Sequence, residues 1–163
     1  ILFHHNIFMN PLNHFLTSFI VLFLIFQNSI STTEILIFSL IFSILLDLNQ
    51  LIGIYLKKPK KHHRTWIEEP FSLIIIGIPL GLILSTIKPE YFFLVIIPYT
   101  LHIIQDYLTI HEVSPLAPFS KKNVNIGFFK PFPKPSWYKK EKGISENYFL
   151  ILNIVILIGI YFF

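Results

Sequence analysis

Cysteine is absent from the 163-residue chain, and methionine occurs only once. The lack of cysteine excludes disulfide bonds and thiolate metal ligands, because both require a cysteine sulfur. Charged residues are also scarce, at 13% of the sequence, about half the share found in ordinary soluble domains. Composition therefore argues against a soluble, disulfide-bonded or zinc-finger protein.

The residues that replace the missing charges are bulky and apolar. The chain is 53% hydrophobic and contains 18 phenylalanines. Its apolar runs are 16 to 24 residues long, close to the ~17–25 residues that a helix needs to cross a bilayer. They are Leu12–Asn28, a run from about Glu34 to Leu56, Phe71–Ile87, Tyr91–Thr109 and Tyr148–Phe163. The sequence therefore predicts an all-α, polytopic membrane helical bundle with about five transmembrane helices.

The domain organisation follows from the same runs. Residues 1–11 lack the charged first region and the small-residue cleavage site of a signal peptide, so we treat them as a leader whose status the sequence leaves open. Residues 12–163 are expected to form a single integral membrane domain. Within it, residues 113–144 form a long loop rich in proline and lysine.

The basic residues predict the orientation of the chain. If successive runs cross the membrane in alternate directions, loops 57–69 and 113–144 lie on the same side as the N-terminus. These two loops hold twelve of the thirteen lysines and arginines, and only Lys88 lies on the other side. Positive charge collects on the cytoplasmic side of membrane proteins. We therefore expect a multi-pass protein of the inner or plasma membrane with a cytoplasmic N-terminus. Since this rule accounts for the basic charge, membrane lipids are expected partners and nucleic acid is not.

One membrane run carries an unusual polar pair. His102 and Asp106 are four residues apart, so they lie on one helix face together with Thr109. Insertion scales put the cost of a charged group inside a membrane helix at ~2.5–3.5 kcal/mol. We infer that such a pair has a compensating role, and a metal site is the role that its residue types favour.

Other metal-ligating residues are predicted at the same membrane level. His14 begins the first run, Asp47 lies in the second, and His63 lies in the loop before the third. The alternation of spans brings all of these positions to the cytoplasmic side, whereas the outer ends carry neither histidine nor aspartate. Four segments of the sequence therefore converge on one predicted site.

Mixed imidazole and carboxylate ligands favour Zn²⁺, Mn²⁺ or Fe²⁺ over Ca²⁺ or Mg²⁺ alone, and we expect Zn²⁺ or Mn²⁺. Such an ion lowers the pKa of bound water towards ~7 and so makes a nucleophile available. In this interpretation Asp47 or Glu68 is the general base, and Arg64 binds an anionic group of the substrate. The sequence predicts a metal-dependent hydrolase of a phosphoester or another lipid-linked group at the cytoplasmic leaflet.

The same residues carry a family resemblance. The segments concerned are Asn13-His14-Phe-Leu-Thr17, Leu-Leu-Asp47-Leu-Asn49-Gln50-Leu, His63-Arg64, His102-x-x-x-Asp106-x-x-Thr109 and Pro115-Leu-Ala-Pro118-Phe-Ser120. Together they resemble the YdjM family of membrane-bound metal-dependent hydrolases, also described as LexA-binding and inner-membrane-associated, over nearly the whole chain from Met9. The resemblance implies a helical metal site with candidate ligands His14, Asp47, His63, His102 and Asp106. It also implies a distant relation to zinc-dependent phospholipase C.

The chain departs from the family pattern at two positions. Asn49 stands where the family usually has the second aspartate of a Pro-Asp-x-Asp element. Glu68 stands where the family usually has the second histidine of a His-Arg-x-x-Thr-His-Ser element. Both changes alter the expected ligand set and leave open whether the site is active.

Two non-enzymatic alternatives stay open. The His102–Asp106 pair and Asp47 are also what a buried, hydrogen-bonded packing contact would use, and His63 with Arg64 is also what a lipid-facing basic loop would use. A transporter-like protein that carries ions or protons, or a degenerate scaffold, would show such residues too.

Overall fold

A computed structural model gives the fold of residues 11–55, 69–108, 119–120, 128–130 and 144–162. In chain order its elements are α1 (Pro11–Phe26), α2 (Thr32–Tyr55), α3 (Pro70–Ser72), the π-helical turn η3 (Leu73–Gly77), α4 (Ile78–Ser85), α5 (Tyr91–Leu108), β1 (Phe129–Lys130), β2 (Ile144–Ser145) and α6 (Glu146–Phe162). The two strands form one short parallel pair. The rest of the described secondary structure is helical, which confirms the predicted class.

The turn between α1 and α2 is fixed by a capping box. The Ser31 hydroxyl accepts the backbone N–H of Glu34 at 3.2 Å, and the Glu34 carboxylate in turn accepts the Ser31 backbone N–H at 3.1 Å. This reciprocal pair satisfies donors that a helix start otherwise leaves unpaired. The helix therefore starts immediately after the polar segment that separates the first two apolar runs.

Proline explains the break in the third apolar run. Pro79 lacks a backbone N–H, and its ring crowds the carbonyl of Ile75 one turn earlier, so a regular α-helix is disfavoured here. The chain instead forms η3, in which the backbone N–H of Ile78 donates to the Leu73 carbonyl, five residues back. The segment from α3 to α4 is thus continuous but locally widened.

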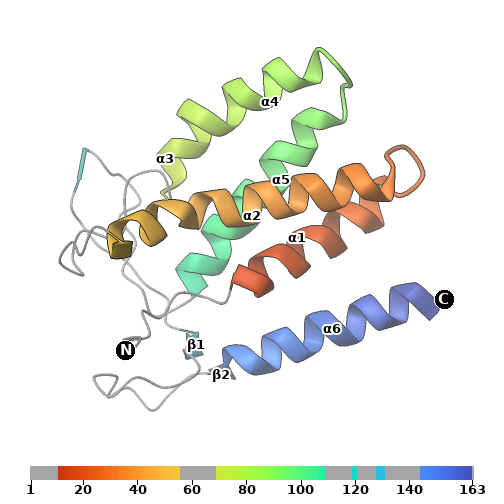
Figure 1. The fold of residues 1–163 in the computed structure, drawn as a ribbon, viewed down its shortest axis with the longest axis vertical. Helices are drawn as coiled ribbons and strands as arrows, with labels where there is room; N and C mark the ends of the chain where they lie inside the picture. Colours follow the sequence, from red (N-terminus) through yellow and green to blue (C-terminus); the bar gives the residue numbers. More distant parts are fainter. Residues whose placement is uncertain (1–10, 56–68, 109–118, 121–127, 131–143, 163) are drawn as a thin grey trace.

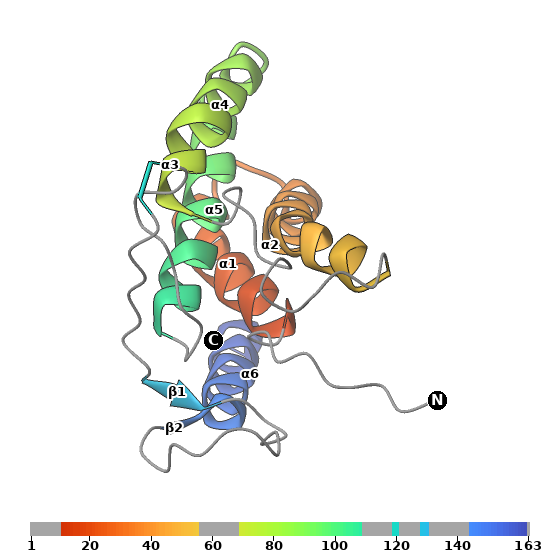
Figure 2. The same ribbon diagram turned by 90° about the vertical axis from the view of Figure 1, so that its left-hand side faces the viewer.

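Helix α5 is the centre of the bundle. It packs against α1, α2, η3 and α4, while α6 packs on α1. Figures 1 and 2 show α4 and α6 on opposite sides of α1. The contact between α6 and α1 includes a hydrogen bond in which the Asn153 amide donates to the Thr17 hydroxyl at 3.1 Å. The candidate site described below is formed by His14, His102, Asp106 and Ser43, where α5 meets α1 and α2.

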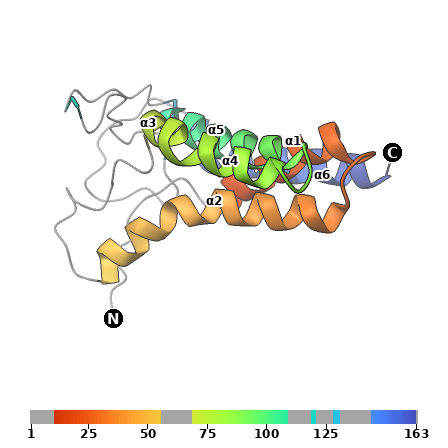
Figure 3. The same cartoon turned by 90° about the horizontal axis from the view of Figure 1, so that it is seen from above.

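The turn between α1 and α2 and the turn between α4 and α5 lie at the same end of the bundle, as Figures 1 and 3 show. Polar contacts join these two turns. The Lys88 ammonium donates to the Glu34 carboxylate at 2.6 Å, and the Tyr91 hydroxyl donates to the same oxygen. The neighbouring carboxylate raises the pKa of Lys88 above its ordinary value. The only lysine expected on this side of the membrane is therefore paired within the protein.

In the sequence, Gly77, Pro79 and Gly81 of the third apolar run predict a kink or a close helix contact, and α4 does approach α5 closely. A Cβ atom at Gly81 would lie 3.0 Å from a ring carbon of Phe92 and 3.4 Å from its backbone oxygen. At Gly77 the nearest atom of α5 would be a Tyr99 ring carbon at 3.5 Å. The prediction that one of these glycines lies in a close helix contact is confirmed, with Gly81 the tighter position.

The helix boundaries agree with the predicted runs to within about two residues. Within the described part of the chain, only Tyr91–Leu108 is long and apolar enough to cross a membrane. The other apolar helical stretches that are fully described are shorter: Pro11–Phe26, Thr32–Ser43, Pro70–Ser85 and Asn147–Phe162. The five-span arrangement therefore stays a prediction. Most of the two lysine-rich loops, and residues 1–10, lie outside the described residues.

Candidate metal centre

Three of the predicted ligands come together between α1 and α5. His14 projects from the first turn of α1, and His102 and Asp106 project from consecutive turns of α5. One ligand atom from each lies within 4.8 Å of the other two, and all three residues are buried. Sequence positions almost ninety residues apart thus form one cluster.

The two imidazoles and the carboxylate have a defined arrangement. The imidazole rings are stacked, with centroids 4.0 Å apart and planes 19° from parallel. Nε2 of His14 lies 3.5 Å from one oxygen of Asp106, and Nε2 of His102 lies 3.8 Å from the other oxygen. Each imidazole therefore directs its Nε2 towards a different oxygen of the same carboxylate.

These separations fit ligands around an ion better than direct hydrogen bonds. N–H···O hydrogen bonds are usually ~2.7–3.2 Å long, so 3.8 Å is too long for one. Ligand atoms at ~2.0–2.2 Å from a tetrahedral ion lie about 3.4 Å from one another. The 3.5 and 3.8 Å between imidazole and carboxylate are close to that spacing, and all three ligand atoms lie within 4.8 Å of one another, so an inward movement of the side chains would complete a three-ligand site.

The tautomer of His102 follows from its backbone partner. Nδ1 of His102 lies 3.1 Å from the carbonyl oxygen of Ser43 in α2. A carbonyl can only accept, so Nδ1 carries the proton and Nε2 keeps its lone pair. Metal-binding histidines commonly donate their second nitrogen to a carbonyl or carboxylate in this way. Helix α2 therefore orients a ligand that α5 supplies.

Ser43 also connects the second histidine to α2. Its hydroxyl donates to the backbone carbonyl of His14 at 3.2 Å, and Ser43 itself is fully buried. One residue of α2 thus contacts both histidine positions. Sequence reasoning missed Ser43. The available signal was the pair Ser39 and Ser43, one turn apart in an apolar helix, because small polar residues are typical of helix–helix contacts in membranes.

A series of hydrogen bonds begins at Tyr99, one turn before His102 on α5. The Tyr99 hydroxyl donates to the Ser72 hydroxyl at 2.7 Å, which donates to the Glu69 carbonyl at 2.6 Å. Glu69 is itself buried, with 3% of its surface exposed. The start of α3 is thereby held against the helix that carries His102 and Asp106, and it brings a buried carboxylate that the predicted site did not include.

The remaining predicted site residues are not placed at the cluster by the structure. Asp47 lies in α2, one turn after Ser43, but its side chain is outside the described part. His63, Arg64 and Glu68 precede α3 and lie outside the described residues altogether. Their roles as ligand, base and anion-binding group stay predictions.

The comparisons with known proteins bear on this site. The sequence profile of the YdjM inner membrane protein family matches residues 9–163. The chain belongs to the YdjM inner membrane protein family. Among curated proteins none matches the chain, and the solved structures contain no match either.

Membership in the YdjM family accounts for the apolar exterior. Large apolar side chains are exposed along α4 and α6, including Ile83 at 64% and Val155 at 58%. Such surfaces are unfavourable in water but are the normal surface of a protein in lipid. The buried histidines and aspartate are thus enclosed within a membrane protein.

Proposed function

We propose that this YdjM family protein is a membrane-embedded, metal-dependent hydrolase that acts on a phosphoester or another lipid-linked group at the cytoplasmic leaflet. The observation that carries the proposal is the buried group of His14, His102 and Asp106, in which the Ser43 carbonyl presets His102 for metal binding. Two imidazoles and one carboxylate also form the protein ligand set of known catalytic zinc sites, which keep one position open.

The chain's own residues have distinct tasks in this proposal. The Ser43 carbonyl and hydroxyl hold the histidine-bearing segments in place. Asp106, whose two oxygens face the two Nε2 atoms, supplies the negative charge that offsets a divalent cation. A divalent ion bound here would supply a water nucleophile at neutral pH. Asp47, Glu68 or the buried Glu69 would accept the proton, and Arg64 would hold the substrate's anionic group.

Gln105 adds a polar group that a substrate can use. It lies between His102 and Asp106 in sequence, and 3% of its surface is exposed. Neither its amide nitrogen nor its amide oxygen has a hydrogen-bond partner in the described part of the chain. A buried amide with unused donors and acceptors is costly unless it binds something, which supports a polar ligand beside the cluster.

The buried polar residues favour a one-sided site over a transport pathway. Beyond His14 and Ser43 the interface of α1 and α2 continues with Ser18 and Ser39, both fully buried. It then closes on an apolar cluster of Leu22, Ile30, Ile35 and Leu94. Ions cross a membrane through continuous polar or hydrated routes. This apolar cluster supports the hydrolase over the non-enzymatic, transporter-like alternative.

The proposal predicts metal-dependent hydrolysis with a defined sidedness. Inverted membrane vesicles, which expose the cytoplasmic leaflet, should hydrolyse an added phosphodiester lipid after Zn²⁺ or Mn²⁺ is supplied. Sealed right-side-out vesicles should be inactive until they are permeabilised. Asp106→Asn should lower the rate by at least ~10²-fold, because the variant loses the charge that holds the ion. Product release is measured by mass spectrometry of the lipid extract.

Controls distinguish the proposed hydrolysis from the predicted orientation of the protein in the membrane. Ile83→Ala on α4 should keep the wild-type rate, since Ile83 is 64% exposed and is not part of the cluster. Activity in sealed right-side-out vesicles alone would overturn the predicted orientation but not the reaction. Equal rates with and without metal, or in Asp106→Asn and the wild type, would refute the hydrolase proposal.

A further inference from the structure

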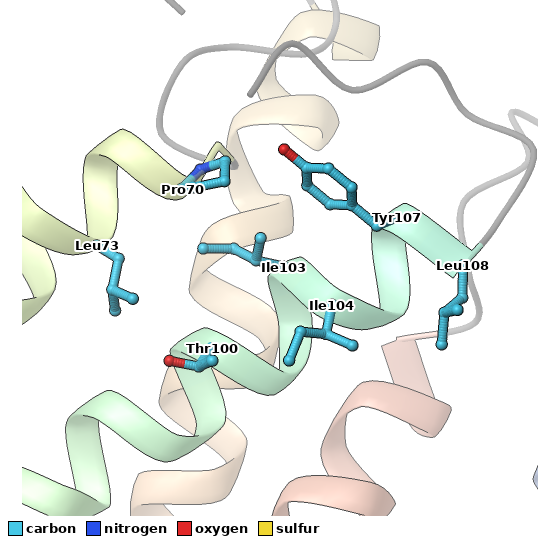
Figure 4. A pocket seen from close by; sticks show the side chains of 7 residues that line it. All are labelled: Pro70, Leu73, Thr100, Ile103, Ile104, Tyr107 and Leu108. Carbon is cyan, nitrogen blue, oxygen red and sulfur yellow. The ribbon is translucent and has the colours of Figure 1, made fainter. Parts of the chain in front are cut away.

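A groove lies on the opposite side of α5 from the metal-type cluster. Its volume is about 430 Å³, and its walls come from α3, η3 and the last two turns of α5. Figure 4 shows Pro70 and Leu73 facing the α5 residues across it. The lining residues are Pro70, Leu73, Thr100, Ile103, Ile104, Tyr107 and Leu108.

The groove exists because the close helix contact ends before it. Gly77 and Gly81 bring α4 against Tyr99 and Phe92 of α5. One turn before Gly77 the small residues give way to Leu73, which sits opposite Thr100. The α-helix there is also replaced by the wider η3 turn. The two helices consequently leave a space at the end of the bundle that carries the candidate site.

The surface of the groove selects an apolar occupant. The atoms that line it are all apolar, even though Thr100 and Tyr107 carry hydroxyl groups. Water requires two to four polar partners to be stable in a cavity, and this lining offers none. The volume is within the ~300–1,000 Å³ typical of small-molecule sites. At the ~30 Å³ of one water, which is close to the size of a CH₂ group, it holds roughly 14 such groups.

We propose that this groove binds one acyl chain of a membrane phospholipid. The protein belongs to an inner-membrane family, so the apolar groups that surround it are the acyl chains of lipids. Ile104, which lines the groove, is 49% exposed, and Ile74 and Ile75, which follow the lining residue Leu73 in η3, are exposed as well. The groove is therefore open towards the surface that lipid covers, and a single flexible acyl chain matches its volume and its wholly apolar walls.

The position of the groove gives the bound lipid a role. Ile103 and Tyr107 line the groove, and each directly follows a residue of the cluster, His102 or Asp106. The groove and the cluster thus lie at the same level of α5, on different faces. A lipid whose chain occupies the groove has its headgroup at the end of α5 where the cluster lies. That this lipid is the substrate rests on the proposed function, whereas its binding does not.

The test uses a phospholipid that carries a photoreactive diazirine in its acyl chain, reconstituted with the full-length protein in liposomes. Cross-linked residues are identified by mass spectrometry of peptides. Labelling is expected to concentrate on the α5 and η3 residues of the groove. Thr100→Trp is expected to reduce that labelling at least about fivefold, because the indole fills the space that the chain needs. Ile104→Trp at the rim provides a second variant should Thr100→Trp fail to fold.

The matched control is Ile83→Trp, which adds an indole at an exposed position of α4 outside the groove. This variant should keep wild-type labelling. His102→Ala should keep it too, so a failed metal site leaves the lipid result intact. Uniform labelling of all exposed apolar positions would overturn the inference. So would groove labelling unaffected by both tryptophan variants, or cross-links showing a second copy of the chain in the groove.

Discussion

His102→Ala is expected to reduce the affinity for Zn²⁺ by at least ~100-fold. Loss of a partner that only orients a metal ligand typically costs 10–100-fold, and this change removes a ligand itself. Alanine has no imidazole, so the variant loses the Nε2 ligand atom that the hydrogen bond from Nδ1 to the Ser43 carbonyl orients. Affinity is measured on detergent-purified protein without a histidine tag, by competition with a chelator of known strength.

Two further variants make the result interpretable. Asp106→Asn keeps the size of the side chain and should also weaken binding, so a folding defect in His102→Ala would not decide the outcome. Ile104→Ala lies on the same helix and should bind as the wild type does. If His102→Ala and Asp106→Asn both retain wild-type affinity, the buried cluster is a packing contact rather than a metal site.

Gly81→Leu is expected to lower the free energy of unfolding by about 1–3 kcal/mol, the usual cost of overpacking a close contact. Even the first added carbon would lie 3.0 Å from the Phe92 ring and 3.4 Å from the Phe92 backbone oxygen. The ring can turn aside, but the backbone oxygen can move only if α4 and α5 separate. Unfolding is followed by heating or by denaturing detergent in micelles.

Gly159→Leu provides the matched control, because a Cβ atom at Gly159 of α6 meets nothing within 4 Å. The same substitution there should be neutral or slightly stabilising, since replacing a helical glycine reduces the freedom of the unfolded chain. Gly77→Leu should be milder than Gly81→Leu, because its closest contact is the flexible end of Leu73 at 2.8 Å. Equal stability of Gly81→Leu and Gly159→Leu would contradict a close α4–α5 contact.

The sequence predicted the helices well because each apolar run is bounded by polar turns. Ser31, Thr32 and Thr33 are all candidate caps for the second helix, and the structure shows Ser31 in that role, in a capping box with Glu34. Pro79 indicated a kink in the third run, and the structure shows the π-helical turn η3 at that place. Local chemistry was sufficient for these features because each depends on neighbours within a few residues.

The candidate site was predictable in part for the same reason. The spacing of His102 and Asp106 placed them on one face of α5, and the alternation of spans placed His14 at the same membrane level. The partner of His102 was not predictable, because Ser43 acts through its backbone carbonyl. Every residue has such a carbonyl, so only the packing of α2 against α5 selects this one.

The acyl-chain groove could not have been found from the sequence. Its residues look like ordinary lipid-facing or core positions of a membrane helix, and the space depends on where the glycine contacts end. The two strands were likewise unpredicted, because two residues are too short to show any alternation. Both features result from how segments distant in sequence are placed together.

The most direct test of the metal centre is X-ray absorption spectroscopy at the zinc edge on the tag-free wild-type protein loaded with one equivalent of Zn²⁺. The expected spectrum shows nitrogen and oxygen ligands at ~2.0–2.2 Å, with the outer scattering of two imidazole rings from His14 and His102. In the His102→Ala protein the scattering from one ring should be lost. A wild-type spectrum with oxygen ligands only and no imidazole scattering would contradict the account.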